Sequence, residues 1–303
     1  MMDTEPHIMR MLSESYGVYD PPHIQYLKYL RVMFSFGVVP PYFGWSTVHH
    51  EFVAQGLYWR LPITLLLLGT ALAVQMIIGI LLGVFAASRR GKKLDVAAIG
   101  VSIITWCIPA FVLQLLAILL FSFIMWETGI EIFSISFFPP PFVEHDLAWW
   151  LQVLWELTLP ILTLVVTGFA YWVLMTRNTL IDALTQDYVV TARAKGLSER
   201  QVLFKHAFKS IHPQIATMIA FSLPSLVTGS IVTEYIFGIE GIGKYFLRLF
   251  WREGMVIVIL DSAATAAVFF IYATLIVVCN LIVDLIYGIL DPRIRISAPG
   301  GRK

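Results

Sequence analysis

Residues 61–93 read LPITLLLLGTALAVQMIIGILLGVFAASRRGKK. The run from Leu61 to Ala87 contains no charged residue, and it is longer than the roughly 20 apolar residues that a helix needs to cross a bilayer. Four basic residues follow directly: Arg89, Arg90, Lys92 and Lys93. This pattern predicts a membrane-spanning helix with a basic flank on one side.

The composition of the whole chain agrees with a membrane protein. Of the 303 residues, 58% are hydrophobic and 14% are charged, and the mean hydropathy is +0.78. Soluble domains carry about 25% charged residues. The net charge of +1 does not point to nucleic acid as a partner. Cys107 and Cys279 lie inside apolar runs, so we expect neither a disulfide framework nor a cysteine metal site.

Five apolar segments predict five membrane-spanning helices. They cover about Leu61–Ala87, Val96–Met125, Trp149–Met175, Gln214–Phe237 and Met255–Leu290. Pro109 and Pro224 lie inside two of these segments, where a proline can kink a helix. The expected fold is all-α and polytopic, with a transmembrane domain over residues 61–290.

The distribution of Lys and Arg predicts the orientation. Most of these residues lie in the link after the first span, the link after the third span and the tail, residues 291–303. The link between the second and third spans has none. Basic links stay in the cytoplasm, so we expect a cytoplasmic tail and an extracytoplasmic N-terminal segment, residues 1–60. Such a charged segment does not cross a membrane unaided. A preceding span absent from this sequence is the favoured explanation, and crossing by another route is the alternative.

The link over residues 177–213 carries the clearest local signals. Residues 186–201 read QDYVVTARAKGLSERQ. Asp187 is a candidate N-cap of a short helix, and Gly196 suits its left-handed C-terminal cap. Ser198 and Gln201 form a capping box for a second helix, with Leu197 and Val202 as its hydrophobic staple.

These signals together predict a helix, a turn and a helix. A link defined this well favours a docking element for another protein. The residues alone equally allow a turn that only returns the chain to the membrane.

This link resembles the EAA loop of binding-protein-dependent ABC permeases, in the version found in oligopeptide and dipeptide permeases. The similarity extends over most of the chain, through Gln25-Tyr26-Leu27, residues 60–65, Gly79–Val84, Gln186-Asp187-Tyr188, Ala192–Ser198, Leu281–Tyr287 and Leu290–Arg293.

The chain departs from the family pattern in two places. The Glu-Ala-Ala of the loop falls on Val190-Thr191-Ala192, which keeps only the second alanine. The family's external motif Phe-x-x-Pro-Gly-x-Gly corresponds to Phe237–Gly243 and has Glu240 in place of proline. The second departure puts the geometry of that loop in question, but not the family.

The resemblance implies a type I ABC importer permease fold, a family that starts with an additional span not found here. It implies a membrane-spanning permease subunit of an ATP-driven importer in the inner or plasma membrane, forming half of the path for peptides or similar solutes. Nickel and oligosaccharides are also transported in this branch. The implied partners are a second similar permease, identical or different, two ABC ATPase subunits and an extracytoplasmic solute-binding protein. ATP and Mg²⁺ would bind to the ATPase subunits, and no cofactor to this chain.

In the family, the EAA loop presents a coupling helix to a cleft in the ATPase. The matching residues here are Asp187, Tyr188, Ala192, Arg193, Ala194, Lys195, Gly196 and Ser198. We expect the small Ala192 and Gly196 to allow close approach of the partner. Arg193 and Lys195 either pair with acidic groups of the partner or face solvent and lipid headgroups. Two polar residues inside the spans, Gln75 and Gln114, either line the path or bond neighbouring helices.

No catalytic or metal-binding arrangement is recognisable in the sequence. Gly238–Lys244 matches the spacing of a phosphate-binding loop, but Tyr245 replaces the Ser or Thr that would bind Mg²⁺. His49-His50-Glu51 has no further ligand close in sequence. The alternatives to an importer subunit are an ion- or proton-coupled secondary transporter, which needs paired acids at the bilayer midplane, and a membrane-embedded enzyme, which needs a convergent catalytic set.

Overall fold

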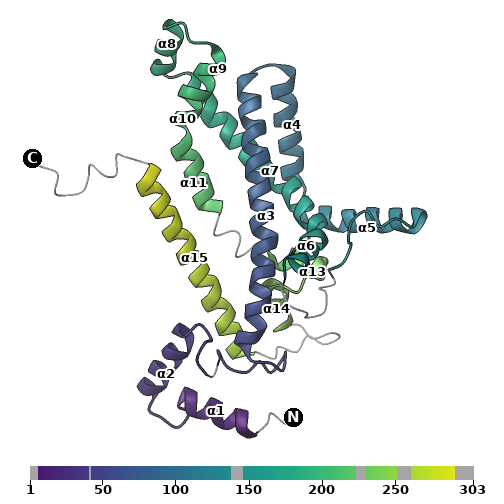
Figure 1. Cartoon of the computed structure of the whole chain (residues 1–303), viewed down its shortest axis with the longest axis vertical. Coiled ribbons are helices and arrows are strands. Elements are labelled where there is room, and N and C mark those ends of the chain that lie inside the picture. Colours follow the sequence, from purple (N-terminus) through teal and green to yellow (C-terminus); the bar gives the residue numbers. More distant parts are fainter. Residues whose placement is uncertain (1–5, 41, 138–145, 223–229, 251–260, 291–303) are drawn as a thin grey trace, which may run out of the picture. The chain divides into compact units, whose positions relative to one another are not determined.

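The computed structural model describes residues 6–40, 42–137, 146–222, 230–250 and 261–290, and these ranges are built from helices (Figure 1). An isolated bridge joins Trp45 and Phe52. The all-α class predicted from the sequence is confirmed. In chain order the helices are α1 Pro6–Tyr16, α2 Pro22–Phe34, α3 Val53–Ser88, α4 Lys93–Cys107, α5 Ala110–Thr128, α6 Leu147–Glu156, α7 Thr158–Leu184, α8 Asp187–Ala194, α9 Glu199–Gln201, the π-helix η1 Val202–Ala207, α10 Phe208–Ser210, α11 His212–Ser222, α13 Ser230–Ile236, α14 Ile242–Arg248 and α15 Ser262–Leu290.

The chain divides into two compact units. The first comprises residues 1–66, 137–139 and 230–275, and the second comprises residues 67–136, 140–229 and 276–303. Helices α3 and α15 contribute residues to both units. The predicted coupling residues belong to the second unit, and the Phe237–Gly243 motif belongs to the first.

Among the described residues, four helices are long and apolar enough to cross a membrane: Val53–Ser88, Ala110–Thr128, Thr158–Leu184 and Ser262–Val283. Each overlaps one of the five predicted spans, so a polytopic membrane protein is confirmed. The remaining predicted span, Gln214–Phe237, includes residues 223–229, which lie outside the described ranges, as does the predicted tail, residues 291–303.

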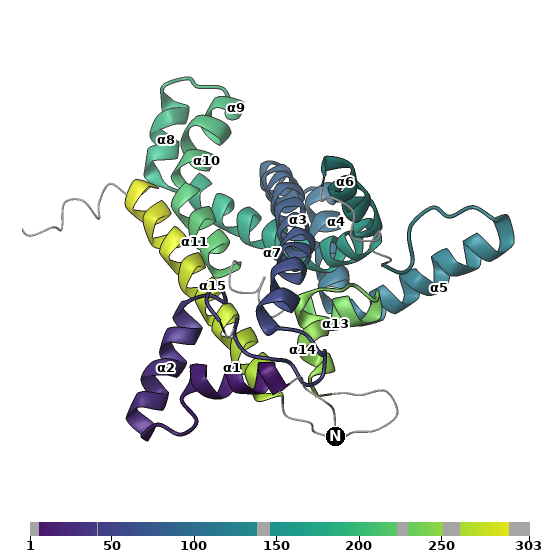
Figure 2. The same ribbon diagram turned by 60° about the horizontal axis from the view of Figure 1, so that its bottom comes forward.

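The second predicted span, about Val96–Met125 with Pro109 able to kink it, is divided into two helices. Helix α4 ends at Cys107 and α5 begins at Ala110. Pro109 has no N–H to continue the helix, and it restricts Ile108 to an extended conformation, with φ −82° and ψ 118°. The two helices therefore point in different directions in both views (Figures 1 and 2).

The third predicted span also differs at both ends. Its first residues form the separate helix α6, which Asp146 caps by accepting a hydrogen bond from the Trp149 N–H at 2.8 Å. The spanning helix α7 starts at Thr158 and continues to Leu184, beyond the predicted end at Met175. The added turns carry the chain directly to the predicted coupling loop.

Two glycines bring α3 against α7 in the second unit. A Cβ atom on Gly79 would lie 2.2 Å from the Cβ of Trp172, and one on Gly83 would lie 2.8 Å from the carbonyl oxygen of Val173. Both distances are far below van der Waals contact, so the helices touch through backbone, as small-x-x-x-small motifs allow. The side-chain amide of Gln75 donates to the Leu164 carbonyl at 2.9 Å and joins the same pair of helices.

An ion pair fixes the start of α4 to α7. Arg177 holds both oxygens of Asp95, with Nε–Oδ1 at 2.6 Å and Nη2–Oδ2 at 2.8 Å. The Asp95 side chain is 2% exposed. Its Oδ2 also accepts from the N–H of Gly91, so the carboxylate shapes the α3–α4 turn. The neighbouring guanidinium holds the pKa of Asp95 below its usual range.

The first unit packs around α14 and the first turns of α3 and α15. Its buried apolar cluster includes Phe43, Leu57, Tyr245 and Val268. Asp261 caps α15 by accepting from the Ala264 N–H at 3.0 Å, and its other oxygen accepts from the Ser46 hydroxyl at 2.7 Å. The segment before α3 is therefore joined to the start of α15 within this unit.

Replacement of Gly79 by Ala tests the close packing of α3 and α7. We expect Gly79→Ala to lower the free energy of unfolding by about 1–3 kcal/mol, because the added methyl group overlaps Trp172. The matched control is Gly69→Ala on the same helix, where a Cβ meets no atom within 4 Å. Thermal unfolding of both variants in detergent measures the difference. Equal loss of stability in the two variants would contradict the predicted contact.

Candidate functional site

The predicted coupling link forms a compact group of short helices at the end of α7. Helix α8 turns two side chains inward, Val189 and Ala192. They belong to a buried cluster that also contains Val84 of α3, Leu180 of α7 and Val202 of η1. The apolar positions of the link therefore attach it to the ends of two spanning helices.

The N-terminus of α8 differs from the prediction by one residue. Gln186 is the N-cap, with extended dihedral angles of φ −77° and ψ 152°, and it makes no side-chain capping bond. Asp187, predicted as the cap, already lies in the first helical turn. A carboxylate there still interacts favourably with the positive end of the helix dipole, which explains why the sequence suggested a cap.

Gly196 ends α8 as predicted. Its φ is +77°, a conformation that side chains disfavour. The N–H of Gly196 donates to the Arg193 carbonyl at 2.9 Å, and the N–H of Leu197 donates to the Ala192 carbonyl at 3.4 Å. This pair of bonds is a Schellman motif. A Cβ on Gly196 would meet no atom within 4 Å, so this corner of the loop is open.

The predicted capping box starts the next helix. The Gln201 N–H donates to Ser198 Oγ at 3.4 Å, and the Ser198 N–H donates to Gln201 Oε1 at 3.1 Å. Leu197 and Val202, the predicted staple residues, both join the buried cluster. The helix, turn and helix predicted for residues 187–201 are confirmed.

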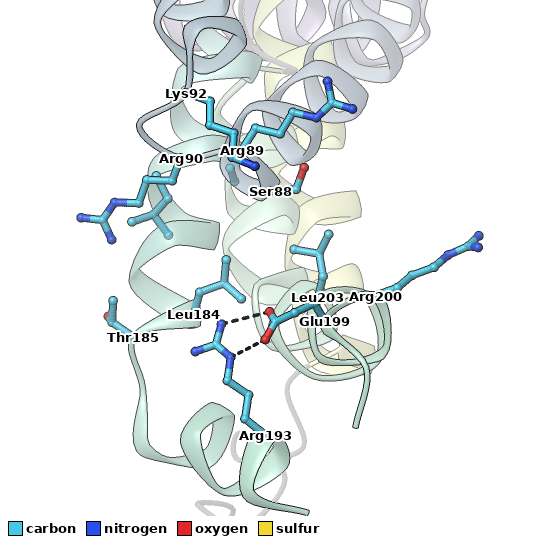
Figure 3. Close-up of a pocket in the computed structure, with 12 residues that line it drawn as sticks. Ser88, Arg89, Arg90, Lys92, Leu184, Thr185, Arg193, Glu199, Arg200 and Leu203 are labelled. Atoms are coloured by element: carbon cyan, nitrogen blue, oxygen red, sulfur yellow. Dashed lines mark hydrogen bonds and ion pairs between the residues drawn. The ribbon is translucent and has the colours of Figure 1, made fainter. Parts of the chain in front are cut away.

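Two side-chain contacts brace the corner. Arg193 of α8 pairs with Glu199 of α9, with Nε–Oε1 at 2.9 Å and Nη2–Oε2 at 3.2 Å (Figure 3). The hydroxyls of Tyr188 and Ser210 lie 2.6 Å apart. The Ser210 hydroxyl donates to the Ala207 carbonyl, so Tyr188 is the donor to Ser210. Both contacts join α8 to the helices that follow it, in addition to the buried cluster of Val189, Ala192 and Val202.

The outer surface of α8 holds most of the predicted coupling residues. Asp187, Tyr188, Arg193, Ala194, Lys195, Gly196 and Ser198 are exposed. Ala192 differs from the expectation: it is 4% exposed, so its small side chain allows close packing inside the chain and not close approach of a partner.

Two exposed apolar side chains were missed by the sequence analysis. Val190 is 58% exposed and Phe204 is 50% exposed, and the predicted coupling residue Tyr188 is 42% exposed. Exposed apolar groups next to charged ones are typical of a protein interface. Helical spacing contained the signal for Val190, because Val189 and Ala192 define the inward face and leave Val190 outside it.

The structure describes the surroundings of both predicted pathway residues. Gln75 bonds the Leu164 carbonyl on α7. Gln114 of α5 is fully buried. Of the two interpretations given for these residues, the contact of Gln75 favours the bonding of neighbouring helices.

A second polar centre lies in the first unit, at the turn between α13 and α14. The carboxylate of Glu234 is fully buried. Its Oε1 accepts from the Thr64 hydroxyl at 2.8 Å, and its Oε2 accepts from the Lys244 N–H at 2.9 Å. Thr64 in turn accepts from the Ile242 N–H at 2.9 Å. Sequence analysis missed Glu234, although an acid inside a predicted span was the available signal.

The residue that departs from the family's external motif also stabilises this turn. Glu240 binds Lys244, with Oε1–Nζ at 2.6 Å, and Arg248, with Oε2–Nη1 at 3.1 Å. Lys244 Nζ also donates to the Gly238 carbonyl at 2.7 Å. The lysine that would contact phosphate in a nucleotide-binding loop is therefore engaged by its own turn.

Within the described ranges, no three or more His, Cys, Asp or Glu side chains lie together as a metal site requires. Two members of the candidate cluster His49-His50-Glu51, which precedes α3, make other contacts. His49 stacks on Tyr245 with ring centroids 4.1 Å apart, and Glu51 pairs with Arg60 at 2.9 Å.

Comparisons with known proteins agree on one family. Residues 79–296 match the family described as binding-protein-dependent transport system inner membrane component. The dipeptide transport system permease protein DppB of Bacillus subtilis is 31% identical, over 98% of this chain and 87% of that protein. The oligopeptide transport system permease protein AppB of the same organism is 36% identical, over 93% and 83%. The peptidoglycan transport system permease protein YejB of Agrobacterium fabrum is 32% identical, over 96% and 76%.

A solved structure shares the fold. A chain of the inward-facing MetNI methionine ABC transporter superposes with a TM-score of 0.55 at 18% identity, covering 77% of this chain and 97% of that one.

Replacement of Glu234 tests the polar centre of the first unit. We expect Glu234→Ala to lower the free energy of unfolding by about 2–5 kcal/mol, because it leaves the buried Thr64 hydroxyl and Lys244 N–H without this acceptor. The control is Glu240→Ala, which removes the ion pairs with Lys244 and Arg248 at the same turn and should cost about 1 kcal/mol, because Arg248 is 46% exposed and Lys244 keeps its bond to the Gly238 carbonyl. Thermal unfolding compares the two variants, and a larger effect of Glu240→Ala would refute the prediction.

Proposed function

Because this chain belongs to the binding-protein-dependent transport system inner membrane components, it is a membrane-spanning permease subunit, and we propose that it couples solute import to ATP hydrolysis on separate ATPase subunits. Its fold is that of an ABC importer permease. Family membership favours this function over an ion-coupled secondary transporter and over a membrane-embedded enzyme.

The observation that carries the proposal is the braced corner of α8 and α9. Both helix ends at this corner are capped by their own sequence, through Gly196 and through Ser198 with Gln201. The inward face joins the ends of α3 and α7, while the outer face remains exposed. A rigid element with an exposed polar and apolar surface is suited to transmit motion from a partner to the spans.

The proposed coupling is mechanical. Closure of two ATPase subunits around ATP and Mg²⁺ would move α8, which their surfaces hold through Tyr188, Val190 and Lys195. The buried contacts of Val189 and Ala192 would pass that movement to α7 and α3. Arg193 would keep the corner rigid through Glu199, so the partner would displace the group of helices as one body.

The proposed assembly follows from this arrangement. Two permease subunits, this chain and a similar second one, would enclose the path, with an extracytoplasmic solute-binding protein delivering the solute. The link over residues 177–213 and the tail, residues 291–303, would lie in the cytoplasm, and residues 1–60 on the opposite side. The basic links support this orientation.

Peptides are the proposed solutes. The relatives are a dipeptide permease, an oligopeptide permease and a peptidoglycan permease, and all of these names refer to molecules that contain peptide bonds. We expect the binding protein to make most of the selection, because each of the four described spans contains an 18-residue stretch with at most two charged residues.

Uptake by the assembled transporter tests the function. The chain, its ATPase subunits and the binding protein are reconstituted in liposomes with ATP on the ATPase side. We expect uptake of labelled di- or oligopeptides that requires ATP and persists when the proton gradient is collapsed. Uptake driven by the gradient alone would contradict an ATP-coupled importer. Uptake of nickel or an oligosaccharide in place of peptides would keep the coupling and refute the substrate.

A side chain at the open corner tests the docking surface. We expect Gly196→Asp to leave the protein inserted and folded but to reduce peptide-dependent ATP hydrolysis at least about tenfold, because the new carboxylate meets only the partner. The matched control is Gly129→Asp. Gly129 also ends a helix with positive φ and has open space around it, but it caps α5. An equal loss in both variants would assign the effect to backbone strain and remove the support for docking.

A further inference from the structure

A basic pocket of about 520 Å³ lies in the second unit, beside the candidate coupling site (Figure 3). The end of α3 and the α3–α4 turn form one side of it, and α9 and the start of η1 form another. Five cationic side chains line it: Arg89, Arg90, Lys92, Arg193 and Arg200. The one carboxylate in the lining is Glu199, which Arg193 binds.

The cations at the α3–α4 turn are held in place. Gly91 adopts φ +76°, and its N–H donates to Asp95 Oδ2 at 2.9 Å. Asp95 is fixed in turn by the bidentate contact with Arg177. The turn that carries Arg90 and Lys92 is therefore anchored to α7, and these charges do not depend on a flexible loop for their position.

The inner part of the pocket is apolar. Ala87, Ile181, Leu184 and Leu203 contribute to its lining. The cationic side chains spread around the rim, with Arg90 and Arg200 extending in opposite directions (Figure 3). Cations around an apolar surface suit an amphipathic anion, whose apolar part can cover that surface, better than a small free anion, which has no apolar part.

The depth of the pocket matches the headgroup layer of a bilayer. The apolar run of α3 ends at Ala87 and the helix at Ser88, so Arg89, Arg90 and Lys92 lie in the turn directly beyond the apolar part of the span. The polar headgroup layer on each side of a bilayer is about 5–8 Å thick. Arg89 stacks over Phe85 at 4.1 Å, and Phe85 and Leu81 below it are exposed apolar side chains that face the level of acyl chains.

We propose that this pocket binds the phosphate-bearing headgroup of an anionic phospholipid, with the acyl chains lying along the exposed apolar surface of α3. Basic pockets between spanning helices recognise anionic headgroups through the same chemistry. An acidic segment of the ATPase is the competing occupant. The lipid is favoured because the apolar lining lies next to the end of α3, which carries the exposed apolar Phe85 and Leu81, whereas the proposed docking face for the ATPase is the outer face of α8.

Native mass spectrometry of the full-length chain in detergent tests the proposal. Phosphatidylglycerol and phosphatidylcholine with identical acyl chains are titrated separately. We expect the anionic lipid to bind more tightly to the unaltered chain. The double variant Arg90→Gln/Lys92→Gln should bind phosphatidylglycerol about 25-fold more weakly, since each cation near the membrane surface contributes a factor of about five.

Two control variants separate charge from folding. Arg90→Lys/Lys92→Arg keeps the charge and should retain the lipid. Lys209→Gln removes an exposed cation of the same unit that does not line the pocket, and it should bind the lipid as the unaltered chain does.

Three results would overturn the proposal. Equal affinity for the two lipids would show that the charge of the headgroup is not recognised. Displacement of phosphatidylglycerol by millimolar inorganic phosphate alone would assign the pocket to a free anion. The third result combines two observations: the ATPase subunits release the lipid, and the double variant binds the lipid as the unaltered chain does. Together they would assign the cations to the protein partner.

Discussion

Because Gly79 and Gly83 have no side chains, the backbone of α3 rests directly on α7. This contact sets the positions of the groups at the C-terminal ends of both helices. The buried cluster that holds α8 includes residues from α3 and α7, so its shape depends on how these helices meet. The Asp95–Arg177 ion pair connects the start of α4 to α7, so α7 also holds the helix that follows α3. A shift of α3 along α7 would therefore disturb the coupling corner and the basic turn together.

Buried carboxylates give this chain its well-defined turns. Asp95, Glu234 and Asp261 are each almost fully buried, and each accepts hydrogen bonds from a backbone N–H at a turn or helix start. Burial of a carboxylate without such partners would cost several kcal/mol or more, so the bonds and the turn geometry stabilise each other. These three buried charges thus serve the architecture of the chain, in keeping with the proposed mechanical function.

The proposed lipid pocket and the proposed docking face share the same support. Arg193 lines the pocket and also braces the corner of α8 and α9. The α3–α4 turn on one side of the pocket and the coupling helices on the other are both attached to the end of α7. An anionic headgroup in the pocket would bridge these two elements, so the proposed lipid site and the proposed coupling corner would depend on each other.

The sequence by itself determined the all-α membrane class, most of the spans and the local structure around Gly196, because apolar run length, helix caps and left-handed glycines act over a few residues. It could not determine the break before Pro109, since a proline inside a span is tolerated or not according to its neighbours. It placed Ala192 on the docking surface, and it missed Val190, Phe204 and Glu234. These outcomes depend on which face of each helix the rest of the chain covers. Only tertiary packing decides that, because residues that share one buried cluster, such as Val84 and Leu180, come from helices far apart in the sequence.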